Sequence, residues 1–279
     1  MAQQHDGPKP CSDSLTVDQD GLIDSEDEDP FKRLRVANGV ENTGTSDLLQ
    51  SELVSVLPGQ CYSLQNKTLT LNFSSKRGGN DSDHAIDAPN LSITLGVDAS
   101  PGCGGVVWPA GQILSNYLFR KGSAYLEGKN VLELGSGTGL VGLVAAMLDP
   151  SHVWITDQAF LLDMMKENVS KNNLASKCTV AELDWGTPVP ANIPRPDMIL
   201  AADCVYFEPA FPLLVQTLCD LVGDKTQVLF CYKKRRKADK RFFAMLKKKF
   251  IWTQVDDDPN RPIYERDSIA LLRITRRKV

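Results

Sequence analysis

The sequence predicts an α/β fold in which a mostly parallel sheet is covered by helices on both faces. Two observations support this prediction. From residue 130 onward, short apolar segments of strand character alternate with longer segments of helical periodicity, as is typical of parallel sheets joined by right-handed crossovers. The first apolar segment runs directly into a turn that contains Gly135, Gly137 and Gly139. Glycines let the main chain pass close to a ligand, and such sheets bind ligands at the carboxyl ends of their strands.

The alternation assigns the elements of the sheet in order. Strands are expected at residues 130–134, 152–156, 178–182, 198–202 and 226–232. Helices are expected at residues 139–148, 159–172, 209–222 and 240–248. Two late strands, Ile251–Val255 and Ser268–Thr275, predict a final antiparallel strand in an otherwise parallel sheet.

A short β extension precedes this sheet. Leu69–Phe73 and Leu91–Leu95 each alternate apolar and polar residues at period two, and a polar loop rich in Gly, Asn and Asp lies between them. This pattern predicts an antiparallel pair. A helix is expected next, from about Ala110 to Leu118.

Charge is unevenly distributed along the chain. Residues 1–50 contain eleven acidic and four basic side chains, a balance of −7, whereas the whole chain carries −4, so the remaining residues sum to +3. This segment includes the acidic run Asp24–Asp29 and has too little apolar surface to offset its ordering entropy. We therefore expect a disordered acidic N-terminal tail over residues 1–50 and one folded domain over residues 51–279.

The composition also excludes some classes of protein. No apolar run approaches the ~20 residues of a membrane span, and the first residues do not resemble a signal peptide. Seven cysteines without a Cys-x-x-Cys pair indicate reduced thiols, and we expect a cytoplasmic location. None of the three histidines lies near a cysteine at metal-ligand spacing, so no metal site is expected.

The second strand of the sheet ends in Asp157, eighteen residues after Gly139. A carboxylate at this position accepts hydrogen bonds from both hydroxyls of a ribose, which favours a nucleoside-bearing cofactor without a 2′-phosphate. The alternative is an Asp that caps the following helix. Leu140 stands where the dinucleotide fingerprint needs its third glycine. With Glu133 before the glycines, the pattern instead resembles motif I of class I methyltransferases, which bind S-adenosylmethionine.

Four further residues are candidates for contact with such a cofactor. Glu133 either orients the glycine turn or meets the ammonium group of the cofactor. After the third strand, Asp184 offers an acceptor and Trp185 a stacking face to an adenine, although Trp185 also suits packing at the domain edge. Trp108, flanked by Gly104, Gly105 and Pro109, either lies over the cofactor or belongs to the core.

The fourth strand of the sheet, Met198–Ala202, is wholly apolar and is followed by Asp203 and Tyr206. Methyl transfer from a sulfonium is an in-line displacement that depends on how the lone pair of the acceptor is aimed. If the acceptor is a lysine amine, Asp203 is suited to hold the amine hydrogens, and Tyr206 is suited to wall the channel. The alternatives are a helix cap for Asp203 and core packing for Tyr206.

A basic cluster, defined here as the ten basic side chains of residues 231–250, follows the fifth strand; the same segment holds one acidic residue, Asp239. The cluster is either a solvated face or a surface that binds phosphate backbones or acidic protein. Residues 233–237 include no aromatic side chain on which single-stranded bases could stack. Docking of an acidic or RNA-associated protein is therefore favoured over direct nucleic-acid binding.

Together these residues resemble the seven-strand lysine methyltransferases called methyltransferase family 16, whose members modify lysines of non-histone proteins. The residues that carry the resemblance are Trp108, Glu133–Gly139, Asp157, Asp184–Gly186 and Asp203–Tyr206. The similarity spans about residues 91 to 276. It implies a Rossmann-like, seven-stranded methyltransferase sheet, mostly parallel with a final antiparallel strand, and S-adenosyl-L-methionine as the cofactor.

The resemblance also implies roles for single residues. Cofactor contacts would come from Trp108, Gly135, Ser136, Gly137, Asp157, Trp185 and Ala202, and Asp203 and Tyr206 would frame the lysine channel. The resemblance extends to the fungal enzymes that methylate translation elongation factor 1A, which implies a protein substrate. We expect a monomer. Two alternatives remain at this point, an RNA methyltransferase guided by the basic cluster and a non-catalytic cofactor-binding module.

Overall fold

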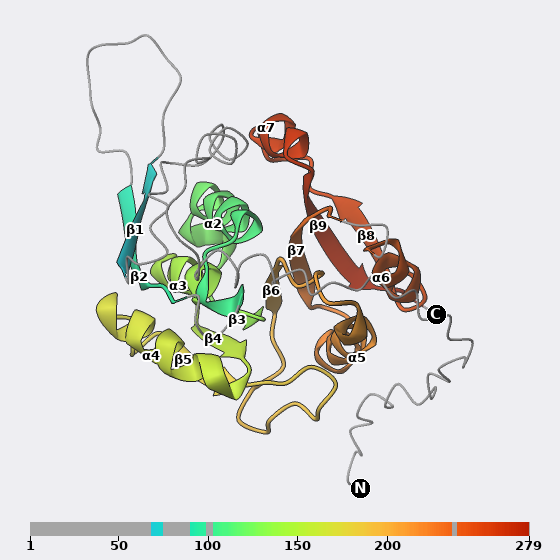
Figure 1. The fold of residues 1–279 in the computed structure, drawn as a ribbon, viewed down its shortest axis with the longest axis horizontal. Coiled ribbons are helices and arrows are strands. Elements are labelled where there is room, and N and C mark those ends of the chain that lie inside the picture. Colours follow the sequence, from blue (N-terminus) through green and yellow to red (C-terminus); the bar gives the residue numbers. More distant parts are fainter. Residues whose placement is uncertain (1–67, 75–89, 99–102, 236–238, 279) are drawn as a thin grey trace, which may run out of the picture. The chain divides into compact units, whose positions relative to one another are not determined.

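The computed structural model describes residues 68–74, 90–98, 103–235 and 239–278 of the chain (Figure 1). The predicted acidic tail and the polar loop between the first two strands lie outside these residues, so the division of the chain at residue 50 stays a prediction. Among the described residues, no helix has the length and apolar character needed to cross a membrane.

A seven-stranded sheet forms the centre of the domain (Figure 1). Its strands are β3 (Asn130–Leu134), β4 (His152–Asp157), β5 (Cys178–Glu182), β6 (Met198–Ala202), β7 (Gln227–Lys233), β8 (Phe250–Gln254) and β9 (Ile269–Arg276). Their order is β5-β4-β3-β6-β7-β9-β8, and β9 runs antiparallel to both of its neighbours. The expected fold class, mostly parallel with a final antiparallel strand, is confirmed.

The strand order reverses between β3 and β6. From β3 the chain proceeds outward through β4 and β5, and then returns to pair β6 on the other side of β3. The crossovers on either side of this point diverge, which leaves room for a ligand at the carboxyl ends of the two strands. The glycine turn follows β3 and Asp203 follows β6, so the topology brings both to this point.

Helices cover both faces of the sheet. They are α2 (Pro109–Lys121), α3 (Leu140–Met147), α4 (Leu162–Lys171), α5 (Phe211–Leu221), α6 (Asp239–Leu246) and α7 (Arg261–Arg266). Short 3-10 turns, Ala159–Leu161 and Glu208–Ala210, precede α4 and α5 and account for the earlier starts predicted for these helices. Helix α7 was not predicted from the sequence, because six residues with a single buried side chain, Tyr264, show no helical periodicity.

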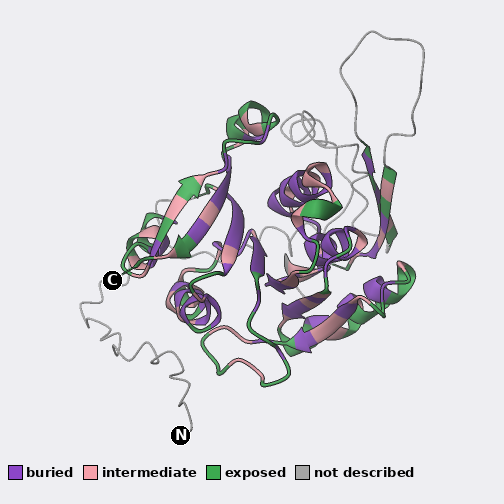
Figure 2. Cartoon of the chain, turned by 180° about the vertical axis from the view of Figure 1, so that it is seen from behind, coloured by how far each residue is buried: buried purple, intermediate pink, exposed green. Residues whose placement is uncertain are grey.

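The strands alternate between two apolar layers. On one side, Val131, Leu200 and Leu229 pack in the core with α2, α3 and α4; on the other, Phe230 stacks on Phe242 of α6 at 5.6 Å between ring centroids. Figure 1 shows α5 and α6 on this second side. Figure 2 shows the central strands coloured as buried along their length. Burial on both faces explains why these strands are continuous apolar runs in the sequence.

The predicted N-terminal pair is also present. Strands β1 (Thr68–Ser74) and β2 (Asn90–Gly96) form a separate antiparallel sheet. Two side-chain amides hold it, one from Asn168 in α4 and one from Asn172, which caps the C-terminus of this helix. The Asn168 side chain accepts from Gly96 N at 2.5 Å and donates to the carbonyls of Gly96 and Thr138, and Asn172 pairs in the same way with Thr94. Asn168 thus joins the β extension to the glycine turn.

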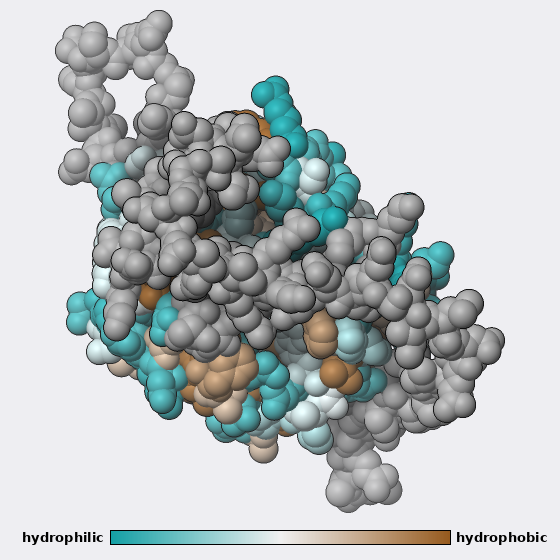
Figure 3. Space-filling model, viewed as in Figure 1, coloured by the Kyte–Doolittle hydropathy of each residue, from teal (hydrophilic) through white to brown (hydrophobic). Residues whose placement is uncertain are grey.

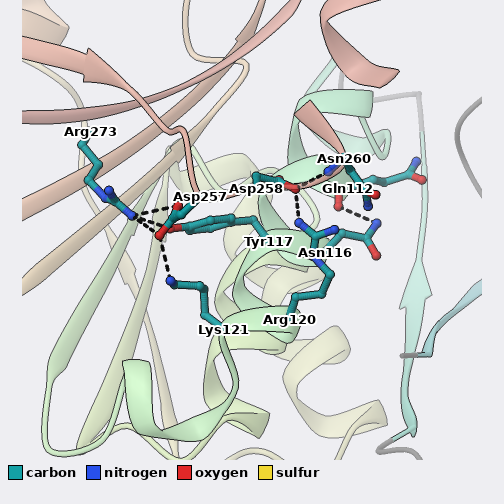
Figure 4. Close-up of polar contacts among 9 residues, drawn as sticks. All are labelled: Gln112, Asn116, Tyr117, Arg120, Lys121, Asp257, Asp258, Asn260 and Arg273. Carbon is teal, nitrogen blue, oxygen red and sulfur yellow. Dashed lines mark hydrogen bonds and ion pairs between the residues drawn. The ribbon is translucent and has the colours of Figure 1, made fainter. Parts of the chain in front are cut away.

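A polar network fixes the end of α2 against the segment between β8 and α7 (Figure 4). Arg120 forms an ion pair with Asp258, and Asp257 accepts hydrogen bonds from Tyr117, Lys121 and Arg273. Burial alone would raise the pKa of Asp257, but these hydrogen bonds outweigh it and lower the pKa to about 2. The network ties α2, which begins beside Trp108, to the far half of the sheet.

The exposed apolar side chains are scattered. On the face drawn in Figure 3, the described apolar residues form small areas separated by hydrophilic ones. Over the whole described surface, the large exposed apolar side chains are Phe160, Phe207, Leu213, Ile251 and Ile263.

The Asn168→Ala substitution should lower the free energy of unfolding by about 2–3 kcal/mol, because it leaves buried main-chain groups of Gly96 and Thr138 without partners. Urea titration followed by circular dichroism measures the change. Lys166→Ala in the same helix is the control. That side chain is 59% exposed, so its loss should change stability by less than about 0.5 kcal/mol. Equal effects of the two substitutions would contradict this role for Asn168.

Candidate functional site

The turn after β3, residues 135–139, has glycine at every second position. Gly135, Gly137 and Gly139 all have left-handed φ angles, of 60°, 56° and 80°. A Cβ on Gly137 would lie 2.5 Å from the carbonyl oxygen of Gly104, and one on Gly135 would lie 2.8 Å from Cζ2 of Trp185. Both distances are shorter than any real contact of a Cβ atom. The turn therefore requires glycine for its conformation and for its packing.

Asp157 ends β4 and braces this turn. Its Oδ2 accepts a hydrogen bond from Gly137 N at 2.7 Å, and its Oδ1 accepts from Gln158 N at 2.8 Å. Burial raises the pKa of Asp157 above its ordinary value, and these main-chain donors oppose that effect. Each oxygen keeps a free lone pair, so the carboxylate remains able to accept from a ligand while it holds the turn.

Ser136 in this turn and Glu133 in β3 are both buried. The Ser136 hydroxyl is bonded to the main chain of Thr156 at 3.0 Å. Glu133 is 2% exposed, and its Oε2 accepts from Gly142 N at 2.9 Å in the first turn of α3. Burial raises the pKa of Glu133 to about 8. Of the two roles open for Glu133, the geometry matches the one that orients the turn.

The segment after β5 supplies a polar atom without a partner. Oδ1 of Asp184 is buried and has no hydrogen-bond partner among the described residues. The next residue, Trp185, is half-buried and lies over Gly135. A buried acceptor without a donor is costly unless a bound molecule supplies the donor. The exocyclic amino group of an adenine is such a donor, so these residues fit the adenosyl part of S-adenosylmethionine.

Asp203, directly after β6, is paired with an arginine. Its carboxylate is buried and accepts from the two terminal guanidinium nitrogens of Arg235, Nη1 and Nη2, at 2.9 and 3.0 Å, and from Lys233 N at 3.1 Å. The Arg235 guanidinium also lies over the ring of Trp108, 5.3 Å from its centroid. Asp203 itself has a left-handed φ of 56°. Asp203, Arg235 and Trp108 thus form one connected group.

Arg235 belongs to the predicted basic cluster, but its pairing with Asp203 was not predicted from the sequence. A signal was available. Strands β6 and β7 are parallel neighbours, so residues just past their carboxyl ends lie at the same edge of the sheet. Asp203 follows β6 by one residue and Arg235 follows β7 by two. An acid and a base at these positions are expected to meet.

Ala202 and Tyr206 flank Asp203, and both are half-buried. Between them, the Cys204 thiol donates to the carbonyl of Leu134 at 3.3 Å, which ties this loop to the end of β3. The structure therefore brings the candidate residues after β3, β4 and β5 together around the glycine turn, and those after β6 together with Trp108. Gly104, on the segment before Trp108, contacts the glycine turn and links the two groups.

The raised pKa of Glu133 predicts a pH-dependent stability. The folded state holds this proton more tightly than the unfolded state, where the ordinary pKa is 4.5. The contribution of Glu133 is therefore fully present below pH 4.5 and is lost as the pH rises towards about 8, by up to about 1.4 kcal/mol per pH unit. Glu133→Gln cannot titrate, so the wild-type protein should lose stability relative to this variant between pH 5 and pH 8 in urea unfolding. If the difference in unfolding free energy between the two proteins stayed constant across this range, the pKa of Glu133 would not be raised by burial.

Comparison with known proteins identifies the family. A family model described as lysine methyltransferase matches residues 87–249, more than half of the 279-residue chain. The chain is 38% identical over 202 residues to Protein-lysine N-methyltransferase EFM6 of Saccharomyces cerevisiae, covering 63% of this chain and 82% of that protein. It is 38% identical over 167 residues to Protein N-lysine methyltransferase METTL21A of Mus musculus, covering 58% and 76%. It is 34% identical over 182 residues to EEF1A lysine methyltransferase 3 of Xenopus tropicalis, covering 65% and 76%.

Among solved structures, the 16S rRNA N2 G1207 methyltransferase RsmC of T. Thermophilus, solved with AdoMet and guanosine, has the same fold. Its TM-score is 0.50 at 18% identity, over 75% of this chain and 51% of that one. The family match decides against the two alternatives of an RNA methyltransferase and a non-catalytic module. The chain belongs to the lysine methyltransferase family and is an S-adenosylmethionine-dependent protein-lysine N-methyltransferase.

Proposed function

We propose that this enzyme methylates a lysine of a translation factor, with elongation factor 1A as the first candidate, at the site between the glycine turn and Asp203. The substrate class is supported by the likeness to EEF1A lysine methyltransferase 3, at 34% identity over 76% of that protein. The observation that carries the location of the site is the buried Oδ1 of Asp184 beside the glycine turn, which has no hydrogen-bond partner in the part of the chain that the structure describes.

In this proposal the cofactor lies across the turn after β3. Asp184 accepts from the adenine amino group, Trp185 faces the ring, and Asp157 accepts from the ribose hydroxyls. The main chain of Gly135 and Gly137 lies against the cofactor, and Glu133 and Ser136 hold that main chain from below through their bonds to Gly142 and Thr156. Trp108 and Ala202 line the side of the cofactor that faces the substrate.

The acceptor lysine enters beside Asp203 and Tyr206. When bound, S-adenosylmethionine supplies an electrophilic methyl group, and the lysine must present an unprotonated amine with its lone pair in line with the breaking bond. Asp203 is suited to accept a hydrogen of the amine and so orient it. Tyr206, three residues further along the same loop, is suited to line the channel.

We further propose that the enzyme acts as a monomer in the cytoplasm. Among the described residues, Cys178, Cys204 and Cys231 are buried thiols that form no disulfide bond. Free thiols are typical of proteins in reducing compartments. Sedimentation of the purified protein tests the monomer, and a fluorescent fusion tests the compartment.

Gly137→Ala should weaken binding of S-adenosylhomocysteine at least about tenfold in calorimetry, equivalent to about 1.4 kcal/mol. The added Cβ would displace the Gly104 segment or the turn itself. Gly122→Ala is the matched control, because Gly122 also has a left-handed φ, of 72°, but a Cβ there meets nothing within 4 Å. Cofactor affinity should survive in this control. Unchanged affinity in Gly137→Ala would contradict the proposed position of the cofactor.

The purified enzyme is added, with tritiated S-adenosylmethionine, to an extract from cells that lack it. The enzyme should label a protein and not RNA, and it should label purified elongation factor 1A at a lysine. Asp203→Ala should abolish labelling while calorimetric affinity for S-adenosylhomocysteine is kept, because the acceptor that orients the amine is lost. Label in another protein would refute elongation factor 1A as the substrate. Loss of affinity in Asp203→Ala would assign this residue to cofactor binding or folding.

A further inference from the structure

The pairing of Asp203 with Arg235 has a consequence for the protonation of the substrate. The Asp203 side chain is only 4% exposed, whereas the Arg235 side chain is 26% exposed. A buried carboxylate without a partner is strongly unfavourable, and it attracts any cation that reaches it. A lysine side chain arrives as a cation, since its ordinary pKa is about 10.4.

An unneutralised carboxylate would work against methyl transfer. It would hold the incoming lysine as an ammonium ion, because an opposite charge within ~4–6 Å favours the charged form. An ammonium nitrogen has no lone pair with which to form the bond to the methyl carbon. Before the transfer, the ammonium must therefore give up one proton to solvent; the lone pair then forms the N–C bond as the electrons of the C–S bond pass to sulfur.

We propose that Arg235 is a positioning residue that neutralises Asp203, so that the acceptor lysine beside this carboxylate is held as an uncharged amine. This inference rests on the proposed position of the lysine. With the guanidinium in place, Asp203 keeps its capacity as a hydrogen-bond acceptor but presents little net charge. The guanidinium cation itself further disfavours a second cation at the same place.

The hydrogen-bond geometry leaves room for such an amine. A carboxylate has about four lone-pair sites. Three of those on Asp203 are used, two by Arg235 and one by Lys233 N. One acceptor position therefore remains for a hydrogen of the substrate amine, which is the number needed to orient it.

Arg235 is held in place from several sides. Its backbone N–H donates to Asp239 at the start of α6 at 3.0 Å, and the preceding Lys234 N donates to the Ser268 carbonyl at 2.8 Å. Its guanidinium lies over Trp108, an arrangement that favours the planar cation of arginine over lysine. Such anchoring suits a fixed part of the site better than a surface charge.

The other titratable groups near Asp203 do not supply this neutralisation. The Cys204 and Cys231 thiols interact electrostatically with Asp203, but burial raises the pKa of both well above the ordinary value, so they remain uncharged. Asp239 is acidic and bonds to the backbone of Arg235. Lys233 reaches Asp203 through its backbone N–H. Among the ion pairs of the described residues, Asp203 is paired with Arg235.

The pH dependence of methyl transfer tests the proposal. The initial rate of tritium transfer into protein lysine is measured from pH 6.5 to 10.5, with extract from cells lacking the enzyme as the acceptor. Arg235→Gln should move the rising limb of the rate to higher pH by about one unit or more, because Asp203 then stabilises the ammonium form. An unmoved limb in a folded Arg235→Gln enzyme would overturn the proposal.

Two variants serve as controls. Arg235→Lys keeps the positive charge but loses the bidentate hydrogen bond to Asp203 and the stacking on Trp108. The rising limb of its rate should therefore stay at the wild-type pH, while the rate itself falls. Lys234→Gln removes one exposed charge next to Arg235, and the rising limb should stay at the wild-type pH. A shift of the limb in Lys234→Gln equal to that in Arg235→Gln would reduce the effect to net charge and refute a specific role for Arg235.

Readouts independent of turnover separate folding from function. Thermal unfolding and calorimetric titration with S-adenosylhomocysteine show whether each variant is folded and binds the cofactor product, and affinity within about threefold of wild type is expected for Arg235→Gln. If Arg235→Gln does not fold, Arg235→Lys provides the test. This variant keeps the positive charge, so a shift of its rising limb to higher pH would overturn the proposal. Because the acceptor is whole extract, the test does not depend on elongation factor 1A being the substrate.

Discussion

Contact of main chain with main chain at the glycine turn is the constraint on which the site depends. The carbonyl of Gly104 occupies the space that a side chain on Gly137 would fill. The segment that begins at Gly104 continues into Trp108, which carries the guanidinium of Arg235 on its ring, and Arg235 in turn holds Asp203. The close contact between the two backbones is thus linked, through Trp108 and Arg235, to the position of Asp203, the acid expected beside the substrate.

Three carboxylates lie near the carboxyl ends of the central strands, two of them buried and Asp157 half-buried, and the structure stabilises each by a different means. Glu133 accepts from the first turn of α3, and burial favours its protonated form. Asp157 accepts two main-chain N–H groups. Asp203 is paired with a full positive charge from Arg235. The cost of burying acidic groups next to an apolar sheet is offset separately at each position, so their chemical behaviour differs although their residue types are alike.

Much of the fold could be predicted from residue patterns. The central strands are buried on both faces, and their apolar runs end where glycine, Asp157 or Asp203 begins, so predicted and observed bounds agree within about a residue. The glycine spacing also predicted a glycine turn at the carboxyl end of β3, where the structure has it. Helix α7 was missed because a helix of six residues is too short to show a period. Whether Glu133 faces the turn or a ligand depends on a rotation about side-chain bonds, which residue spacing does not determine.

The sequence by itself determined the class of sheet, the position of the glycine turn and the order of the acidic residues, because these follow from local periodicity and from residues with special backbone freedom. Tertiary structure decided which charges meet. Asp203 and Arg235 are 32 residues apart and become partners because β6 and β7 lie side by side. Asn168 joins Gly96 to Thr138 because α4 packs between the extension and the turn. Such pairs depend on strand order and helix packing, which are properties of the whole chain.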